Sequence, residues 1–361
     1  MPPEPALRPA RNAAASHGLI RLMLVDDSIT ARTVLSRIVE RQGDMAVAAT
    51  ASSAEQALDL LRTVEVDVIL LDLEMPGIGG LGALPAIIAA ARGARIMVVS
   101  ALTVAGAEHT VQALALGAAD TLVKPAVGGF DEAYRSALVD KIRSLGNPAT
   151  DATRAAPKPA PAIRPASRKS ASIVAIGAST GGIHALGRML GALPHRLDVP
   201  IVITQHLPGS FMEVFAQQLA RVCGYQPEVA RDGTRVRPGH ILVAPGHAHM
   251  TLVQDRDGLA VRLNRAPAAS GCTPSVDPMF ASLARVLGPH VVGVLLSGMG
   301  RDGLEGARMI TAAGGSIFAQ DEASSAVWGM PRAVAEAGLA SAILPPEQIA
   351  ARIAACAGMA A

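Results

Sequence analysis

The sequence predicts an α/β protein made of two doubly wound domains, each built around a parallel sheet. Short apolar stretches alternate with longer stretches of helical periodicity along most of the 361 residues, as in parallel strands joined by right-handed crossovers. A stretch rich in proline and alanine, 146–170, interrupts the alternation once and predicts an extended linker. Half of the residues are hydrophobic, which is ample for two packed cores. We therefore expect a disordered extension at 1–18, one domain at 19–145 and a second at 171–361.

The first domain is expected to contain five strands and five helices in strict alternation. The predicted strands lie at 22–25, 45–49, 66–71, 95–100 and 121–123. The predicted helices lie at 30–41, 54–62, 81–91, 106–116 and 131–145. Because the strands run parallel, their carboxyl ends meet at one edge of the sheet, where such a fold has its functional crevice.

Polar residues stand at the carboxyl ends of four of these strands. They are Asp26 and Asp27, Asp72, Ser100, and Lys124. Convergent carboxylates repel one another unless a cation lies among them, and Mg²⁺ binds such carboxylates together with water and phosphate oxygens. A lysine and a hydroxyl across the same pocket would pair with a phosphoryl group. Each aspartate alone is most often a turn residue, but five such positions at successive strand ends predict a phosphoryl-transfer site.

The first domain resembles a response-regulator receiver. The resemblance rests on VDDS at 25–28, LDLEMPG at 71–77, SA at 100–101 and VKP at 123–125. It implies a flavodoxin-like fold of five parallel strands and a phosphate transferred from a histidine kinase. The implied site has Asp72 as phosphate acceptor. Asp27, Asp72 and the Glu74 carbonyl would ligate Mg²⁺, with Asp26 acting on the ion indirectly, and Ser100 and Lys124 would contact the phosphoryl group. One position departs from the pattern: Thr121 stands where many receivers carry a switching Phe or Tyr.

The second domain again alternates between apolar stretches and helical patterns. The predicted strands lie at 172–176, 200–204, 227–230, 241–244, 291–296 and 316–319, with a hairpin at 250–254 and 259–263. The predicted helices lie at 183–190, 211–222, 276–287, 304–312 and 346–355. This too is a mainly parallel, doubly wound pattern.

Three residues of a hydrolytic triad follow separate strands of the second domain. Ser179 lies in GASTG at 177–181, which fits the nucleophile-elbow pattern G-x-S-x-G, although the pentapeptide alone fits a plain strand-to-helix turn equally well. A serine hydroxyl needs a base, which His206 provides at neutral pH, and a carboxylate such as Asp302 would orient that base. Taken alone, Asp302 is better explained as the cap of the helix that begins at Leu304. Together the three predict acyl transfer in one crevice.

Composition and motifs exclude several other functions. A dinucleotide site fails twice, because Ser179 replaces the second glycine of G-x-G-x-x-G and Gln205 and His206 replace the ribose-binding acid. A net charge of +2 and 2% aromatic residues argue against a nucleic-acid partner. Three scattered cysteines without a C-x-x-C pair suggest neither a zinc site nor disulfides. No apolar stretch reaches membrane-spanning length, so we expect a cytoplasmic protein without direct membrane insertion.

The second domain resembles the catalytic domain of CheB, a family of chemotaxis response-regulator protein-glutamate methylesterases. The matching segments are IGASTGG at 176–182, QHLP at 205–208, VAPG at 243–246, PSVD at 274–277, LSGMGRDG at 296–303 and GMP at 329–331. The resemblance implies Ser179 as nucleophile, His206 as base and acid, Asp302 as the orienting carboxylate and the Met299 N–H in the oxyanion hole. It implies no cofactor in the esterase site. Cys272 and Thr273 depart from the larger or more basic residues expected before PSVD.

The two resemblances together imply a phosphorylation-activated methylesterase. Its substrates would be glutamate methyl esters on methyl-accepting chemotaxis receptors, with deamidation of receptor glutamines as a related activity. Its phosphodonor would be a CheA-type histidine kinase. The alternative is a non-catalytic module that docks to a kinase or receptor under control of the receiver.

Overall fold

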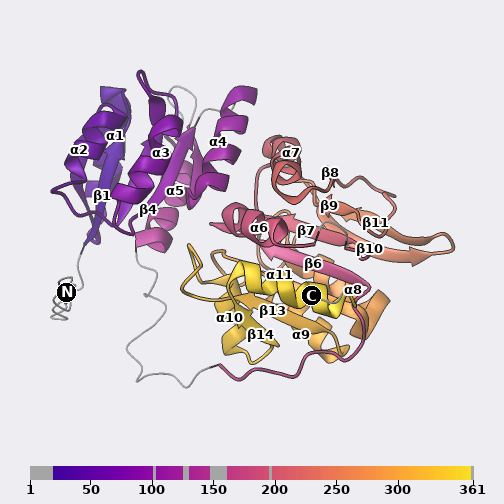
Figure 1. The fold of residues 1–361 in the computed structure, drawn as a ribbon. Coiled ribbons are helices and arrows are strands. Elements are labelled where there is room, and N and C mark those ends of the chain that lie inside the picture. The colour runs from indigo at the N-terminus through magenta and orange to yellow at the C-terminus, as the bar shows by residue number, and fades with distance from the viewer. Residues whose placement is uncertain (1–18, 101–102, 125–129, 147–160, 195–196, 359–361) are drawn as a thin grey trace, which may run out of the picture.

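The computed structural model describes residues 19–100, 103–124, 130–146, 161–194 and 197–358, which form two α/β units (Figure 1). The predicted extension at 1–18 and residues 147–160 of the predicted linker lie outside the described residues, as do Ala101 and Pro125 of the receiver motifs. The described remainder of that linker, 161–170, contains neither helix nor strand.

The N-terminal unit is a five-stranded parallel sheet in the order β2-β1-β3-β4-β5. Its strands are β1 (Ile20–Val25), β2 (Met45–Ala51), β3 (Val68–Asp72), β4 (Arg95–Ser100) and β5 (Asp120–Val123). Its helices are α1 (Ile29–Glu40), α2 (Ala54–Leu60), α3 (Gly79–Ala90), α4 (Val104–Leu116) and α5 (Glu132–Gly146). Every residue of β3 is buried, as expected of a central strand with helices on both faces.

The C-terminal unit is a seven-stranded parallel sheet in the order β14-β13-β12-β6-β7-β9-β8. The strands are β6 (Ile173–Ala178), β7 (Ile201–Gln205), β8 (Pro227–Val229), β9 (Ile241–Val243), β12 (Val291–Leu295), β13 (Ser316–Gln320) and β14 (Ala342–Leu344). The helices are α6 (Gly182–Gly191), α7 (Met212–Cys223), α8 (Val276–Leu287), α9 (Leu304–Ala312), α10 (Met330–Glu336) and α11 (Pro346–Cys356), with 3₁₀ turns at Gly209–Phe211 and Gly288–His290. An antiparallel hairpin of β10 (His249–Asp255) and β11 (Gly258–Asn264) extends from this unit and packs against α8 (Figure 1).

The predicted fold class is confirmed for both units, and each strand and helix expected from the sequence is present. Two short elements were missed. The helix α10 has seven residues and begins with a Met-Pro pair, so it offers too little periodicity to be recognised. The edge strand β14 has three residues and is stabilised by its pairing with β13, which no local pattern reveals.

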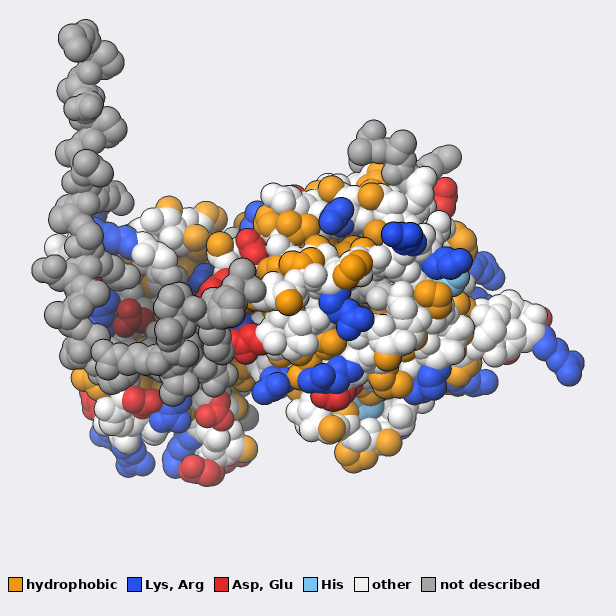
Figure 2. Space-filling view, turned by 90° about the horizontal axis from the view of Figure 1, so that it is seen from below, with side chains coloured by type: hydrophobic (Ala, Val, Ile, Leu, Met, Phe, Trp, Pro, Cys, Tyr) orange, Lys and Arg blue, Asp and Glu red, His pale blue; other side chains and the backbone are white. Residues whose placement is uncertain are grey.

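The two units contact each other through α4, which lies against α6 and α7 (Figure 1). On the face shown in Figure 2, basic side chains are dispersed among apolar and neutral ones and form no single patch. None of the helices in the described part of the chain is long and apolar enough to cross a membrane.

Candidate functional site

The predicted phosphoryl-transfer residues meet at the carboxyl edge of the N-terminal sheet. The Lys124 Nζ atom, just beyond β5, lies 2.5 Å from Asp72 Oδ2 and 3.2 Å from Asp26 Oδ2. Carboxylate oxygens of Asp26, Asp27 and Asp72 lie within 4.8 Å of one another. Asp26 and Asp72 are buried, whereas Asp27 is exposed at the mouth. The backbone N–H of Glu74 donates to Asp72 Oδ1 (3.0 Å), which holds this carboxylate in place.

The charge balance of this pocket fits a divalent cation. Burial raises the pKa of Asp72; the Lys124 ammonium and the Glu74 N–H lower it, and the Asp26 charge raises it again, leaving the pKa above its usual value. The net rise means that one lysine does not compensate two buried carboxylates. A hard cation with oxygen ligands, such as Mg²⁺, would supply the missing positive charge.

Ser100 and Thr121 lie near this pocket. The hydroxyl of Ser100, the last residue of β4, bonds to Thr110 Oγ1 on α4 (2.5 Å), and Thr110 donates onward to the Gly106 carbonyl, so the contact of Ser100 with a phosphoryl group stays a prediction. The Thr121 hydroxyl is buried and makes no hydrogen bond to the described residues. Tyr134 on α5 lines the same cavity as Thr121, and burial, then the Asp26 charge, raises its pKa to about 12.

In the C-terminal unit, the three triad candidates follow three adjacent strands. Ser179 follows β6, His206 follows β7, and Asp302 lies in the loop after β12. The close approach of that loop to Ser179 requires a glycine: a Cβ on Gly298 would lie 2.8 Å from the Ser179 Cβ. The backbone of Ser179 is fixed by its N–H, which donates to the Ser297 carbonyl (3.0 Å). Close backbone contacts therefore shape the crevice around Ser179, in addition to its side chains.

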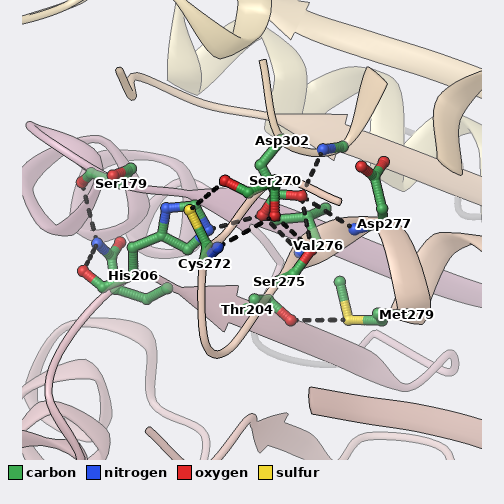
Figure 3. A network of polar contacts seen from close by, with 12 residues as sticks. Ser179, Thr204, His206, Ser270, Cys272, Ser275, Val276, Asp277, Met279 and Asp302 are labelled. Carbon is green, nitrogen blue, oxygen red and sulfur yellow. Dashed lines mark hydrogen bonds and ion pairs between the residues drawn. The ribbon is translucent and has the colours of Figure 1, made fainter. Parts of the chain in front are cut away.

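His206 and Asp302 form a direct pair, with His206 Nε2 2.7 Å from Asp302 Oδ2 (Figure 3). Burial lowers the pKa of His206, but the hydrogen bond with Asp302, the neighbouring Cys272 side chain and the charge of Asp302 outweigh it and raise the pKa to about 9. Burial raises the pKa of Asp302, but His206 and surrounding donors outweigh it and lower the pKa to about 2. Asp302 is thus a stable anion beside a histidine that gains a proton readily.

Asp302 does not cap its own helix, as its sequence position alone suggested. The N-cap of α9 is Gly303, which provides no side-chain bond. The Asp302 carboxylate accepts from the N–H of its neighbour Gly303 (3.0 Å) and, across the crevice, from the N–H groups of Val276 (2.8 Å) and Asp277 (3.3 Å) at the start of α8. Free N–H groups at a helix N-terminus stabilise a negative charge there. Asp302 therefore caps the N-terminus of α8, a helix that precedes it in the chain.

Ser275 is a site residue that the sequence reasoning quoted within PSVD without giving it a role. Its hydroxyl donates to Asp302 Oδ1 (2.7 Å), and its N–H donates to His249 Nδ1 (2.9 Å). Both Ser275 and His249 are buried. No local signal distinguishes this serine from the other serines of the chain, because its partner lies in a different loop.

Ser179 and His206 both line a cavity of about 290 Å³ that lies between the two units. The Ser179 hydroxyl makes no hydrogen bond to the described residues, and so it does not contact His206 in this arrangement. Catalytic hydrogen bonds often tighten only when substrate is present. The backbone N–H of Met299 likewise makes no hydrogen bond to the described residues, which leaves it available as a donor.

Comparison with known proteins gives the family. The family model for CheB methylesterase matches residues 174–353, and that for the response regulator receiver domain matches 22–129. A relative from Paramagnetospirillum magneticum, named protein-glutamate methylesterase/protein-glutamine glutaminase 1, is 40% identical over 92% of this chain and 94% of its own. A relative from Caulobacter vibrioides named protein-glutamate methylesterase/protein-glutamine glutaminase 2 is 44% identical over 91% of this chain and 96% of its own.

The chain belongs to the CheB methylesterase family.

A solved structure agrees with this assignment for the C-terminal unit. The Thermotoga maritima CheB methylesterase catalytic domain matches with a TM-score of 0.50 and 33% identity, over 51% of this chain and 97% of that one.

In this CheB-family chain, the receiver contacts the residues that directly follow Ser179. Thr180 Oγ1 donates to Asp120 Oδ2 (2.7 Å), and the Gly181 N–H donates to the Ala119 carbonyl (2.6 Å). Asp120 and Thr180 are 9% and 7% exposed, so the contact excludes solvent. Lys141 of the receiver lies 2.7 Å from the same Asp120 oxygen. The receiver therefore covers one side of the crevice, at the N-terminus of α6.

Proposed function

We propose that this chain is a phosphorylation-activated protein-glutamate methylesterase with Ser179, His206 and Asp302 as its catalytic triad. The observation that carries the proposal is the 2.7 Å bond between His206 and Asp302 beside a crevice that Ser179 also lines. The family membership supports it, and it favours this function over a non-catalytic docking module.

The reaction proceeds by acyl transfer. The Ser179 Oγ attacks the carbonyl carbon of a γ-glutamyl methyl ester while His206 takes its proton. The tetrahedral intermediate collapses with loss of methanol, which receives that proton from His206, and leaves an acyl-enzyme. Water, deprotonated by His206, then attacks the acyl carbon and releases glutamate and the free serine. Asp302 stabilises the imidazolium at both stages, and the Met299 N–H stabilises the developing oxyanion.

The hydrogen bond of His206 supports a separate role for each of its two ring nitrogens. Because Nε2 is bonded to Asp302, the nitrogen that exchanges a proton with Ser179 is Nδ1. In the described arrangement Ser179 does not reach that nitrogen, so a small movement of the serine rotamer or of the loop precedes attack.

The receiver regulates this reaction through Asp72, the proposed phosphate acceptor. Asp26, Asp27, Asp72 and the Glu74 carbonyl would hold Mg²⁺, which neutralises charge on the incoming phosphoryl group. Lys124, now bonded to Asp72, would transfer its bond to a phosphoryl oxygen, and Ser100 would leave Thr110 to do the same. These rearrangements take place beside β5. The first residue of β5, Asp120, accepts a hydrogen bond from Thr180 of the C-terminal unit. Phosphorylation thereby shifts the two units towards an open arrangement.

The names of the relatives, protein-glutamate methylesterase/protein-glutamine glutaminase, support protein glutamate methyl esters as the substrate class. The resemblance to CheB further predicts methyl-accepting chemotaxis receptors as the proteins that carry these esters, and a CheA-type histidine kinase as phosphodonor. Glutaminase activity uses the same acyl chemistry, with ammonia leaving in place of methanol.

The test is methanol release from methylated receptor membranes, with and without a small phosphodonor. We expect release that rises with the donor in the wild type and does not rise in Asp72→Asn. Ser179→Ala should abolish release under both conditions, and ester hydrolysis that survives this change would refute the triad. Ammonia release from unmodified receptor, measured in parallel, tests the glutaminase activity.

A further inference from the structure

Cys272 lies against the catalytic histidine, a contact that the proposed mechanism does not use. A ring nitrogen of His206, the Cys272 Sγ and a carboxylate oxygen of Asp302 lie within 4.8 Å of one another (Figure 3). His206 and Cys272 are partly exposed, whereas Asp302 is buried. The cysteine comes from the loop between β11 and α8, far along the chain from the other two residues.

These three side chains are the donor types that zinc prefers. Zn²⁺ binds thiolate sulfur, imidazole nitrogen and carboxylate oxygen, commonly in a tetrahedron in which an exchangeable site keeps one open position. The carboxylates of the receiver offer oxygen donors only, which suit Mg²⁺ better than zinc. We therefore expect Zn²⁺ to bind at Cys272, His206 and Asp302, and Mg²⁺ to bind at the receiver carboxylates.

We propose that Cys272, His206 and Asp302 form an inhibitory zinc site, in which a bound Zn²⁺ ion occupies the catalytic histidine and stops acyl transfer. The thiol binds as thiolate and the imidazole binds in its neutral form, so the thiol and the His206 imidazolium each release one proton to solvent. The fourth ligand is a water molecule or the Ser179 hydroxyl, since Ser179 and His206 line one cavity.

Zinc binding requires a small rearrangement of the three donors, because His206 Nε2 and Asp302 Oδ2 are now joined by a hydrogen bond. Metal–ligand distances of about 2.0–2.3 Å place the donor atoms of a tetrahedral zinc site roughly 3–4 Å apart. Asp302 is held by Ser275 and the N-terminus of α8. The 2.7 Å separation of His206 Nε2 and Asp302 Oδ2 is shorter than a zinc site needs, so the imidazole moves slightly away from the carboxylate as zinc replaces their hydrogen bond. Cys272 lies in a segment without helix or strand, and its thiol donates one long hydrogen bond, 3.8 Å, to the Ser270 carbonyl. The thiol and the imidazole are thus the donors that move to complete the site.

Zinc binding can be tested whether or not the chain has the proposed esterase activity, whereas inhibition by zinc rests on that activity. Full-length protein is freed of metal with a chelator, supplied with excess Mg²⁺ to occupy the receiver carboxylates, and titrated with Co²⁺. Cobalt bound through a thiolate gives a charge-transfer absorption in the near ultraviolet, and added Zn²⁺ removes it by competition. We expect this band in the wild type and in Cys356→Ser, a matched control whose thiol is also half-buried, but not in Cys272→Ser.

The affinity for Zn²⁺, from the same competition, should weaken at least about tenfold in Cys272→Ser. Ester hydrolysis is then measured against zinc, with each variant referred to its own zinc-free rate, and Cys272→Ser should need at least about tenfold more zinc for half inhibition. Cys272→Ala gives a second variant should the serine disturb the loop.

A wild type without the thiolate band, or a band that persists in Cys272→Ser, overturns the site. Thiolate-bound metal that leaves ester hydrolysis unchanged overturns the inhibitory role while the binding site stands. A protein without any esterase activity defeats the proposed function, yet the cobalt titration still decides the site.

Discussion

Replacing Asp120 with alanine should raise the esterase rate of the unphosphorylated protein. Asp120 makes three side-chain hydrogen bonds, to the Thr121 N–H, to Lys141 and to Thr180. The first two lie within the receiver and are lost equally from the open and closed arrangements. Of the three bonds, only the 2.7 Å bond to Thr180 joins the two units, so it is the one whose loss changes the balance between open and closed arrangements.

The size of the effect follows from the burial of this bond. A buried hydrogen bond to a charged group contributes about 1.5–3 kcal/mol. Since about 1.4 kcal/mol corresponds to a factor of ten, losing it shifts the ratio of open to closed protein by roughly 10- to 150-fold. The basal rate should rise by the same factor until the open arrangement predominates, and stimulation by a phosphodonor should shrink accordingly.

The assay is methanol release without phosphodonor, with the thermal stability of each variant recorded alongside. The matched control is Asp44→Ala, which removes a receiver carboxylate that pairs with Arg143 (2.8 Å) on the exposed surface. An exposed pair of this kind contributes little, so the basal rate of the control should stay unchanged. A basal rate in Asp120→Ala equal to that of the control, with both proteins folded, would refute the view that this bond keeps the crevice closed.

Three further predictions concern the crevice itself. Gly298→Ala should cost most of the activity, because its Cβ would lie 2.8 Å from the Ser179 Cβ, and a wild-type rate would contradict the tight approach of the loop. Ser275→Ala removes a 2.7 Å bond to Asp302 and should lower kcat about tenfold with little change in KM; an effect confined to KM would contradict its positioning role. Because the pKa of His206 is raised to about 9 and the imidazole must be deprotonated to act as base, kcat/KM should rise about tenfold per pH unit from pH 7 to 8, reach half its maximum near pH 9 and level off above about pH 10. A profile that is already flat at pH 7 would show that the free histidine is not the titrating base.

The overall fold could be predicted from the sequence because it depends on local patterns. Apolar stretches, helical periodicity and the order of strands determine which residues stand at strand ends. The carboxyl ends of parallel strands meet at one edge, which is why Asp26, Asp72 and Lys124 were expected together and are found together. The same reasoning placed His206 and Asp302 in one crevice, where they form a direct bond.

Local sequence patterns could not predict the shortest helices and strands or the hydrogen-bond partners of individual side chains. The three residues of β14 form a strand because β13 offers hydrogen bonds. The first residue of α10, Met330, is held by the loop after β12, because its N–H donates to the Gly298 carbonyl (2.8 Å). The bond between the Ser100 hydroxyl and Thr110 was likewise not foreseen, and the contact of Ser100 with a phosphoryl group stays a prediction. These interactions depend on how neighbouring elements pack, which no local pattern reveals.

The sequence by itself determined which residues reach the two edges and, through its motifs, the family to which the chain belongs. Only the tertiary structure decided that Asp302 caps α8 and not α9, that Ser275 supports it, and that Cys272 lies against His206. The physical reason is that strand ends follow from backbone periodicity, which is local. The partners of a buried carboxylate or thiol are decided instead by how separate loops pack against one another.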